Sequence, residues 1–348
     1  MNFRTDAIDQ DWPRLAHHLE AHGHRLVLDA PPRQFASGFA NFNYLLDVDG
    51  KPCVLRRPPP GPLPPGAHDM VREHRVLSGL WRAFPLAPRA FHLCEDTSVL
   101  GAPFFLMEYR RGIAIGAELP PALAGRPDEA TRIAGELVDV LCDLHRVDPA
   151  VVDLDSLGRP QGFLARQVAG WAKRAHLACD GQPGRRVRRI VEWLEDHIEP
   201  ERAVSLVHND FKLDNVLLDP DRFTPVAVVD WDMCTRGCPL YDLAILLSYW
   251  TEPDDHPVMH LLRQMPSAAP GFPSRAEVLD AYARRSGIDI GNFRFHRALS
   301  VFRLAIVFRQ LVNLYRGGVR KSPESAGFGD VAEGLLDFTA AIVEGRLD

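Results

Sequence analysis

The 348-residue chain contains six cysteines but no paired cysteine spacing. The C-x-x-C pairs of many zinc and redox sites are absent, and the chain is too long for a small secreted scaffold held by disulfides. Cys142 falls in a run with helical spacing, where a cysteine is typical of a small buried apolar residue. We therefore expect a protein of the reducing cytoplasm.

Excess positive charge and long uncharged apolar runs are also missing. A net charge of −6 at pH 7 argues against a nucleic-acid-binding protein, whose affinity depends on neutralising phosphates. The most apolar long segment, residues 299–315, contains Arg303 and Arg309, which indicates a buried helix and not a membrane span. The N-terminal residues MNFRTDAIDQDW are acidic and lack an apolar core, so we expect no signal peptide.

Two common phosphate-binding loops are excluded as well. The sequence has no GxxxxGK[ST] segment, which rules out a Walker loop. The segment GFGDVA at 327–332 fits a dinucleotide-binding pattern by its letters, but no βαβ unit surrounds it. Phosphate binding, if present, must depend on other groups.

The order of the predicted elements indicates an α+β fold in two lobes. A chain of this length, with 46% hydrophobic and 25% charged residues, is ordinary for a globular protein and long enough for two packed lobes. Short β-rich runs surround one predicted helix, 69–84, up to a boundary near residues 109–112. The predicted strands are 34–37, 42–48, 52–57, 90–94 and 104–109, with Asp49-Gly50 as a hairpin turn. After the boundary, the predicted helices are 128–146, 162–179, 185–198, 240–250, 275–286, 293–315 and 331–343, and short strands are predicted at 204–207, 215–218 and 226–229.

One motif in the second part combines the groups that phosphoryl transfer needs. It reads His208-Asn209-Asp210-Phe211-Lys212-Leu213-Asp214-Asn215, and Asp230 follows fifteen residues later. Transfer from a nucleotide needs an acid that accepts the proton of the attacking hydroxyl, then an amide and a carboxylate that hold Mg²⁺ on the phosphates. A single Asp in a loop is usually a turn or cap residue. Three matching positions at set spacing favour function.

This order and spacing resembles the catalytic loop and metal-binding Asp of the protein-kinase-like superfamily, and HNDFKLDN is most similar to the aminoglycoside phosphotransferase family. The resemblance implies a five-stranded antiparallel nucleotide-binding lobe at 1–110 and a mainly helical catalytic and acceptor-binding lobe at 111–348. It implies that Asp210 orients and deprotonates the acceptor hydroxyl, and that Asn215 and Asp230 coordinate Mg²⁺. ATP would be the phosphoryl donor. Asp232 stays open between a solvated carboxylate and a partner of the metal site.

The resemblance extends into the β-rich part. Arg56 takes the place of the family's usual Lys on the third strand, and strand alternation lets only one of Arg56 and Arg57 point inward. Glu73 matches the helix acid that pairs with this cation. The alternative is that Glu73 forms a surface ion pair with a residue one turn away on its own helix. Glu108 and Tyr109 match the segment that meets adenine, where a buried strand is the alternative.

Two further positions carry implied roles. Ser37, in a loop with a single glycine, would supply a polar contact to the nucleotide phosphates. Asp242 matches the residue that braces the catalytic loop through backbone hydrogen bonds, whereas Cys238 departs from the family's usual Asp.

The acceptor is open at this stage. The segments VLRRPPPG and HNDFKLDN most resemble those of phosphotransferase domains associated with acyl-CoA dehydrogenases. This resemblance implies a small-molecule acceptor such as a hydroxyacyl-CoA or hydroxy acid. An aminoglycoside or choline-type kinase is an alternative, since Glu252, Asp254 and Asp255 would suit a cationic acceptor. A nucleotide-binding pseudokinase is another. The cluster Arg185, Arg186, Arg188 and Arg189 is either a solvated helix face or a docking patch for an anionic acceptor.

Overall fold

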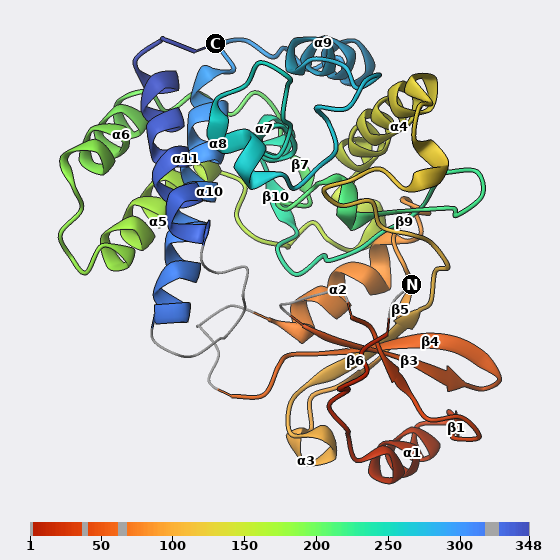
Figure 1. Ribbon diagram of the computed structural model, residues 1–348. Coiled ribbons are helices and arrows are strands. Elements are labelled where there is room, and N and C mark those ends of the chain that lie inside the picture. The colour runs from red at the N-terminus through yellow and green to blue at the C-terminus, as the bar shows by residue number, and fades with distance from the viewer. Residues whose placement is uncertain (1–2, 37–40, 62–67, 317–326, 348) are drawn as a thin grey trace. The chain divides into compact units, whose positions relative to one another are not determined.

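The computed structural model describes residues 3–36, 41–61, 68–316 and 327–347. The chain forms two compact units (Figure 1). Unit 1 comprises Met1–Ala114, Pro149–Asp155 and Val216–Cys234, and unit 2 comprises Ile115–Asp148, Ser156–Asn215 and Thr235–Asp348. The motif at 208–215 therefore belongs to unit 2, whereas Asp230 belongs to unit 1.

Unit 1 is built on a curled antiparallel sheet, which in the described residues has six strands in the order β1-β3-β4-β6-β5, with β2 also paired to β3. The strands are β1 Leu26–Val27, β2 Arg33–Gln34, β3 Phe42–Val48, β4 Lys51–Arg57, β5 Ala90–Cys94 and β6 Phe104–Glu108. Asp49 and Gly50 join β3 to β4 with φ values of 55° and 74°. Positive φ at both central residues is what a tight hairpin turn requires.

The two faces of this sheet are covered by different helices (Figure 1). On one face, α1 (Trp12–Ala21) and α3 (Thr97–Leu100) contribute Leu15, Leu19 and Val99 to an apolar core with strand residues such as Tyr44 and Leu55. On the other face lies α2 (Met70–Leu80), where His74 contacts the ring of Phe105. Successive strand residues alternate between these faces.

Two later segments complete unit 1. The strands β8 (Val216–Leu218) and β9 (Pro225–Val228) pair with each other, and Ile113 forms an isolated bridge with Leu218. Gly112 makes this approach possible, because a Cβ there would lie 2.8 Å from Leu217 Cβ and 2.9 Å from a Val226 methyl carbon. The backbone N–H of Val228 donates to the Leu86 carbonyl at 2.8 Å, which ties the segment before Asp230 to unit 1.

Unit 2 is mainly helical. Its helices are α4 Pro127–Arg146, α5 Phe163–Ala178, α6 Arg185–Asp196, α7 Pro239–Ser248, α8 Pro257–Leu262, α9 Arg275–Ser286, α10 Arg294–Arg316 and α11 Phe328–Val343. The short strands β7 (Ser205–Val207) and β10 (Thr235–Gly237) pair antiparallel, and the 3₁₀ turns η1 Pro121–Leu123 and η3 Leu213–Asn215 lie in the same unit, whereas η2 Pro149–Val152 lies in unit 1.

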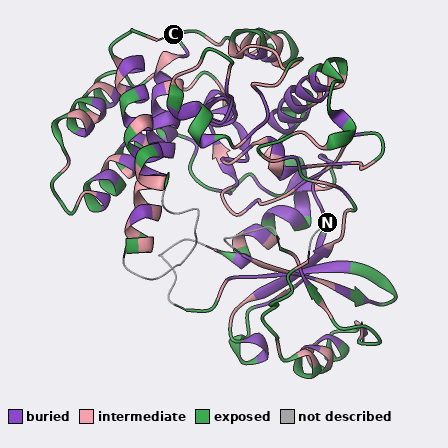
Figure 2. Cartoon of the chain, viewed as in Figure 1, coloured by how far each residue is buried: buried purple, intermediate pink, exposed green. Residues whose placement is uncertain are grey.

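The helices α7 and α10 carry site residues into the interior of unit 2. Every residue of α7 is buried, and α10 packs against α5, α7 and α11 (Figure 2). By length and composition α10 would be long and apolar enough to cross a membrane, and 61% of its most apolar 18-residue window is buried inside the structure. Arg303 on this helix is only 4% exposed, as the sequence predicted for a buried helix.

The structure corrects several details of the predicted elements. The sheet has one strand more than the five predicted, because β1 is only two residues long and pairs at the edge of β3. The predicted strand at 34–37 is Arg33–Gln34, and Ser37 lies outside the described residues. The helices α1, α3 and α8 were not predicted. The α+β class and the order of β-rich and helical parts are confirmed.

Candidate active site

The motif that begins at His208 forms a loop between β7 and η3, and Asp242 of α7 braces this loop. The backbone N–H groups of His208 and Asn209 each donate to the Asp242 carboxylate at 2.7 Å. His145 of α4 lies 3.2 Å from the same carboxylate, and both side chains are buried. Asn209 adopts a left-handed φ of 59°, which a non-glycine residue keeps only when its surroundings fix it. The bracing role that the resemblance implied for Asp242 is therefore confirmed.

Asp210 follows Asn209 and meets two side chains from distant helices. Arg303 Nη2 of α10 lies 3.0 Å from Asp210 Oδ1. The Tyr249 hydroxyl, one residue beyond α7, donates to the same oxygen at 3.2 Å. The Asp210 side chain is 22% exposed. Oδ1 therefore has two partners, whereas Oδ2 has, within the described residues, only a long 3.5 Å contact with Asn215 Nδ2.

The charges around Asp210 keep its carboxylate ionised. Burial by itself raises the pKa of Asp210, but Arg303 and Lys212 outweigh it and lower that pKa below its usual value. Burial and the nearby Asp210 raise the pKa of Tyr249, so its hydroxyl remains protonated and able to donate. Lys212 pairs with Asp214 at 2.9 Å, which holds the ammonium beside the loop. The arrangement gives one oriented carboxylate whose Oδ2, among the described residues, has only the long contact with Asn215.

Asn215 presents its amide oxygen away from the loop backbone. Its Nδ2 donates to the Asp210 carbonyl at 2.9 Å, and Oδ1 accepts no hydrogen bond from the described part of the chain. An oxygen presented in this way is the kind of ligand that Mg²⁺ prefers. The donor set of the motif therefore fits the metal that the resemblance implies.

In unit 1, Arg56 bridges two carboxylates. Arg56 Nε donates to Glu73 Oε2 at 2.7 Å, and Arg56 Nη2 donates to Asp230 Oδ1. Arg56 and Glu73 are buried, whereas the Asp230 side chain is 34% exposed. The prediction that Arg56 and Glu73 pair is confirmed, and the alternative of a surface pair for Glu73 is wrong.

The second carboxylate oxygen of Glu73 fixes the segment that carries Asp230. Glu73 Oε1 accepts the backbone N–H of Trp231 at 3.1 Å, and Trp231 is fully buried. Burial raises the pKa of Glu73, and the Arg56 guanidinium opposes the rise. Asp230 itself has a left-handed φ of 70°, so its backbone conformation is imposed by these contacts.

The remaining predicted residues lie at the end of β6 or outside the described chain. Glu108 is the last residue of β6, and its side chain pairs with Arg110 at 3.0 Å. Its backbone N–H donates to the carbonyl of Arg89, the residue before β5, at 2.8 Å. The ring of Tyr109 stacks on the ring of Phe35, with 6.4 Å between the ring centroids. Ser37 lies outside the described residues, and the nucleotide contacts of all three stay predictions.

The sequence analysis missed the roles of Tyr249 and Arg303. Both contact Asp210 from positions 39 and 93 residues further along the chain, which no local spacing reveals. One signal was present, because an arginine inside an apolar helix needs a buried partner. In the described residues no group of three or more His, Cys, Asp and Glu could hold a metal ion, so a metal would need amide or phosphate oxygens as well.

The sequence of this chain is similar to those of several known proteins. The sequence model of the phosphotransferase enzyme family matches residues 32–297. Acyl-CoA dehydrogenase family member 10 of Mus musculus is 32% identical over 306 residues, which cover 88% of this chain and 28% of that protein. Acyl-CoA dehydrogenase family member 11 of Homo sapiens is 31% identical over 327 residues, which cover 93% of this chain and 41% of that protein. The chain thus spans less than half the length of these curated relatives.

Solved structures with the same fold include several small-molecule kinases. A candidate aminoglycoside phosphotransferase from Ralstonia eutropha superposes with a TM-score of 0.78 at 27% identity, covering 97% of this chain and 99% of that one. A macrolide 2′-phosphotransferase of type I gives 0.57 at 19% identity, covering 94% and 97%. A choline kinase from Cryptosporidium parvum gives 0.60 at 12% identity, covering 90% and 89%. The last two likenesses show the fold alone.

Proposed function

Because the chain belongs to the phosphotransferase enzyme family, we propose that it transfers the γ-phosphoryl group of ATP to a hydroxyl group of a small molecule. The observation that carries the proposal is the environment of Asp210. Its carboxylate is held ionised by Arg303 and oriented by Tyr249, with one oxygen left for an acceptor hydroxyl. A general base must be deprotonated and positioned before the acceptor arrives.

In the proposed reaction several residues of unit 1, and Asn215 of unit 2, bind and orient the nucleotide. Arg56 contacts phosphate oxygens, for which its planar guanidinium is well suited. Glu73 holds the Arg56 side chain in place. Asn215 and Asp230 are the proposed ligands of Mg²⁺, which when bound neutralises charge on the phosphates. Glu108, Tyr109 and Ser37 are the proposed contacts to the rest of the nucleotide.

Asp210 then acts on the acceptor. It accepts the proton of the acceptor hydroxyl as that oxygen attacks the γ-phosphorus, the bond from phosphorus to the bridging oxygen breaks, and ADP leaves. Loss of such a base and of the positioning that it supplies typically costs at least ~10² in rate. The protonated Asp210 carboxyl then releases this proton to solvent as the phosphorylated product departs, which returns the base to its ionised form.

For the acceptor we propose a hydroxyacyl-CoA or a hydroxy acid. Similarity to acyl-CoA dehydrogenase family members supports this class. A cavity of about 540 Å³ in unit 2 also supports it, because the lining is largely apolar: Leu119, Met259, Met265 and Pro266 are among its residues. Thr251 lines the same cavity two residues beyond Tyr249, which contacts Asp210. An apolar lining suits an acyl chain better than a polycation.

The acidic residues that would suit an aminoglycoside are largely engaged. Arg275 pairs with Glu252 at 2.6 Å and with Asp255 at 2.6 Å, and only Asp254 of the three is exposed without an ion pair in the described chain. This arrangement weakens the case for a polycationic acceptor.

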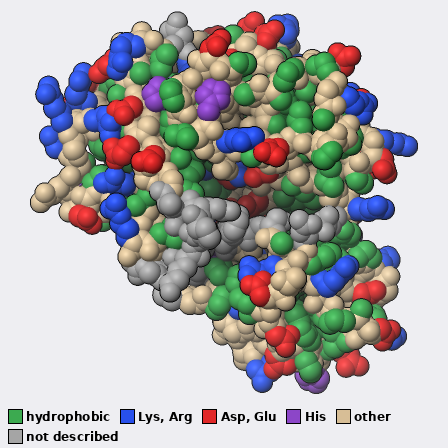
Figure 3. All heavy atoms as spheres, viewed as in Figure 1, with side chains coloured by type: hydrophobic (Ala, Val, Ile, Leu, Met, Phe, Trp, Pro, Cys, Tyr) green, Lys and Arg blue, Asp and Glu red, His purple; other side chains and the backbone are tan. Residues whose placement is uncertain are grey.

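The arginine cluster on α6 is less available for an anionic acceptor than its sequence suggested. Arg186 pairs with Glu333 and Asp337 of α11, and Arg189 lies 3.3 Å from Glu344. Figure 3 shows basic and acidic side chains mixed over this part of unit 2. Half of the cluster thus serves helix packing, and we do not assign it to acceptor docking.

The test is an ADP-release screen of the purified protein with hydroxyacyl-CoAs, free hydroxy acids, choline and kanamycin, with Asp210→Asn as the matched inactive control. We expect turnover with a hydroxyacyl-CoA or hydroxy acid. Turnover confined to kanamycin or choline would overturn the acceptor class. ATP binding without turnover on any acceptor would instead indicate a nucleotide-binding pseudokinase.

A further inference from the structure

Arg56 and Arg57 are neighbours on β4, but their charges are balanced very differently. Arg56 faces α2 and pairs with two carboxylates. Arg57 pairs across the sheet with Phe42 and lies on the opposite face, where α1 and α3 pack. Arg57 is only 6% exposed. In the described residues no carboxylate lies within ion-pair distance of the Arg57 guanidinium.

The hydrogen bonds of Arg57 leave part of the guanidinium free. Nε donates to the Pro58 carbonyl at 3.3 Å, and Nη1 donates to the Leu100 carbonyl at 2.7 Å and to Gln10 Oε1. Nη2 makes no hydrogen bond to the part of the chain that the structure describes. All the acceptors are neutral, so the positive charge is not compensated. Burial lowers the pKa of Arg57, in keeping with a cation that lacks a counter-ion.

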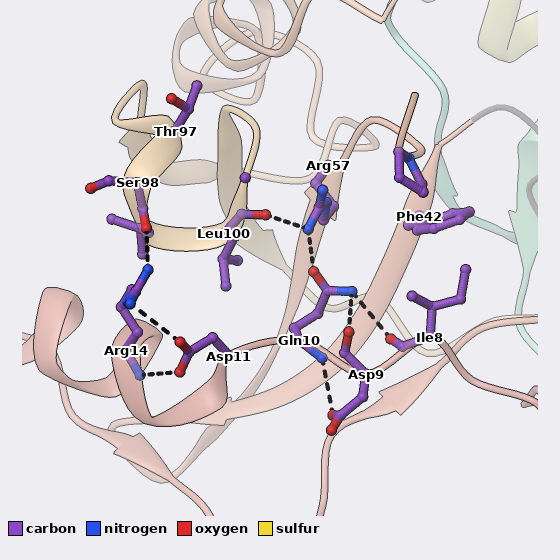
Figure 4. A pocket seen from close by; sticks show the side chains of 13 residues that line it. Ile8, Asp9, Gln10, Asp11, Arg14, Phe42, Arg57, Thr97, Ser98 and Leu100 are labelled. Carbon is purple, nitrogen blue, oxygen red and sulfur yellow. Dashed lines mark hydrogen bonds and ion pairs between the residues drawn. The ribbon is translucent and has the colours of Figure 1, made fainter. Parts of the chain in front are cut away.

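Arg57 lines a cavity of about 520 Å³ on the face of the sheet where α1 and α3 pack (Figure 4). Gln10, Phe42, Pro60, Ser98 and Leu100 line it as well. Figure 4 shows the Arg57 guanidinium between Leu100 and Gln10, with the ring of Phe42 on one side. The volume falls within the range of small-molecule sites, and a mixed apolar and polar lining is typical of them.

The other charged groups of this cavity do not neutralise Arg57. Asp11 caps α1 by accepting the backbone N–H of Arg14 and pairs with the Arg14 guanidinium at 3.4 Å. The exposed Asp9 accepts the Trp12 indole N–H at 2.8 Å and the Gln10 backbone N–H at 3.0 Å. Solvent screens exposed charges much more than buried ones. The least screened charge of the cavity is therefore that of Arg57.

We propose that this cavity binds a small organic anion, whose carboxylate or phosphate group pairs with Arg57 and whose apolar part lies against Phe42 and Leu100. A buried charge without a partner is costly, and an anion removes that cost through a charge-assisted hydrogen bond to Nη2. The site lies on the face of the sheet opposite to Arg56. It is separate from the proposed phosphoryl transfer.

Calorimetric titration of the full chain tests the proposal with four probes: hexanoate, hexyl phosphate, inorganic phosphate and the neutral hexanol. We expect hexanoate or hexyl phosphate to bind, hexanol to fail, and inorganic phosphate to bind more weakly because it lacks the apolar part. Which of the two hexyl anions binds tighter distinguishes a carboxylate site from a phosphate site. Binding of hexanol as tight as that of the anions, or no binding of any anion, would overturn the proposal.

Three variants locate the binding. Arg57→Gln should weaken anion binding at least about tenfold, because it removes the charge-assisted contact. Ser98→Trp should block the cavity from α3 while leaving Arg57 in place, which keeps the test valid if Arg57→Gln fails to fold. Arg82→Gln, which removes an arginine outside the cavity that pairs with Asp153, is the control and should bind as the original chain does. Anion binding that survives Arg57→Gln and Ser98→Trp but is lost in Arg56→Gln would assign it to the other face of the sheet and refute the site.

Discussion

Arg303 Nη2 lies 3.0 Å from Asp210 Oδ1, although 93 residues separate the two in the chain. The arginine reaches the carboxylate from the middle of α10, where it is almost fully buried. The contact joins the longest apolar helix of unit 2 to the loop that carries the proposed base. A buried pair of this kind fixes both the charge and the orientation of the carboxylate.

The first prediction concerns the pH dependence of turnover. Arg303 lowers the pKa of Asp210, so replacing Arg303 with Met should raise that pKa. Since the base must be ionised, the acidic limb of the kcat profile should move to higher pH. Arg303→Lys should restore part of the shift. The matched control is Arg309→Met on the same helix, whose partner is Glu333 at 2.6 Å and which should leave the limb in place. An unmoved limb in Arg303→Met would show that the arginine has only a packing role.

The second prediction concerns Asp210 itself. Asp210→Asn keeps the shape of the side chain and should lower kcat by at least about a hundredfold while sparing ATP·Mg²⁺ binding. Asp210→Ala should do the same, with an added loss of stability because the buried Arg303 is left without its partner. Stopped-time product assays and calorimetric titration measure the two effects separately. Near-normal kcat in either variant would refute the assignment of the base.

How much of this site the sequence predicts depends on how local the contacts are. The motif at 208–215 and Asp230 could be predicted from spacing, since the loop and the strand that leads to Asp230 are each a few residues long. Strand alternation predicted that Arg56 and Arg57 face opposite sides, and the contacts of Arg56 with Glu73 confirm the register. Tyr249 and Arg303 could not be placed, because only the packing of α7 and α10 brings them to Asp210.

The elements that the sequence analysis missed are short or partly hidden. The strand β1 has two residues and depends on its pairing with β3, not on its own pattern. The helix α1 was missed although Leu15 and Leu19 have helical spacing and Asp11 caps its first turn. Its apolar face is narrow, with Leu15 and Leu19 as its buried residues. Tertiary packing, in this case against the sheet, supplies most of the stability of a helix of this length.

The third prediction concerns the brace of the catalytic loop. Asp242→Asn should destabilise the fold by roughly 3 kcal/mol, because an amide cannot replace a buried carboxylate that accepts two backbone N–H groups and faces His145. Thermal and denaturant unfolding measure the change. Asp254→Asn, at an exposed position of the same unit, is the control and should stay within about 0.5 kcal/mol of the original chain. Equal stabilities of the two variants would mean that the loop holds its shape without Asp242.

The fourth prediction separates the two proposed metal ligands. Asp230→Ala should weaken Mg²⁺-dependent ATP binding more than Asn215→Ala does, because a charged oxygen contributes more to a divalent site than a neutral amide oxygen. The structure adds a second effect, since Asp230 also holds Arg56. Titrations with and without Mg²⁺ distinguish them: loss of the metal ligand affects only the metal-dependent part. Unchanged ATP·Mg²⁺ affinity in Asp230→Ala would contradict the proposed ligand.

The last prediction compares the neighbouring arginines of β4. Arg56→Ala should lower kcat/KM by at least about a hundredfold with a moderate loss of stability, because the proposed phosphate contact and the bridge between Glu73 and Asp230 both disappear. Arg57→Ala should reduce the amount of folded protein, since it empties a buried position beside Gln10 and Leu100, but the kcat/KM of the folded fraction should change little. Activity must therefore be normalised to folded protein, measured by circular dichroism and gel filtration of the same sample. The two variants remove the same side chain from adjacent residues of one strand, so each is the other's control. A larger loss of kcat/KM in Arg57→Ala would place the phosphate contact on the face of the sheet that packs against α1, and would refute the role proposed for Arg56.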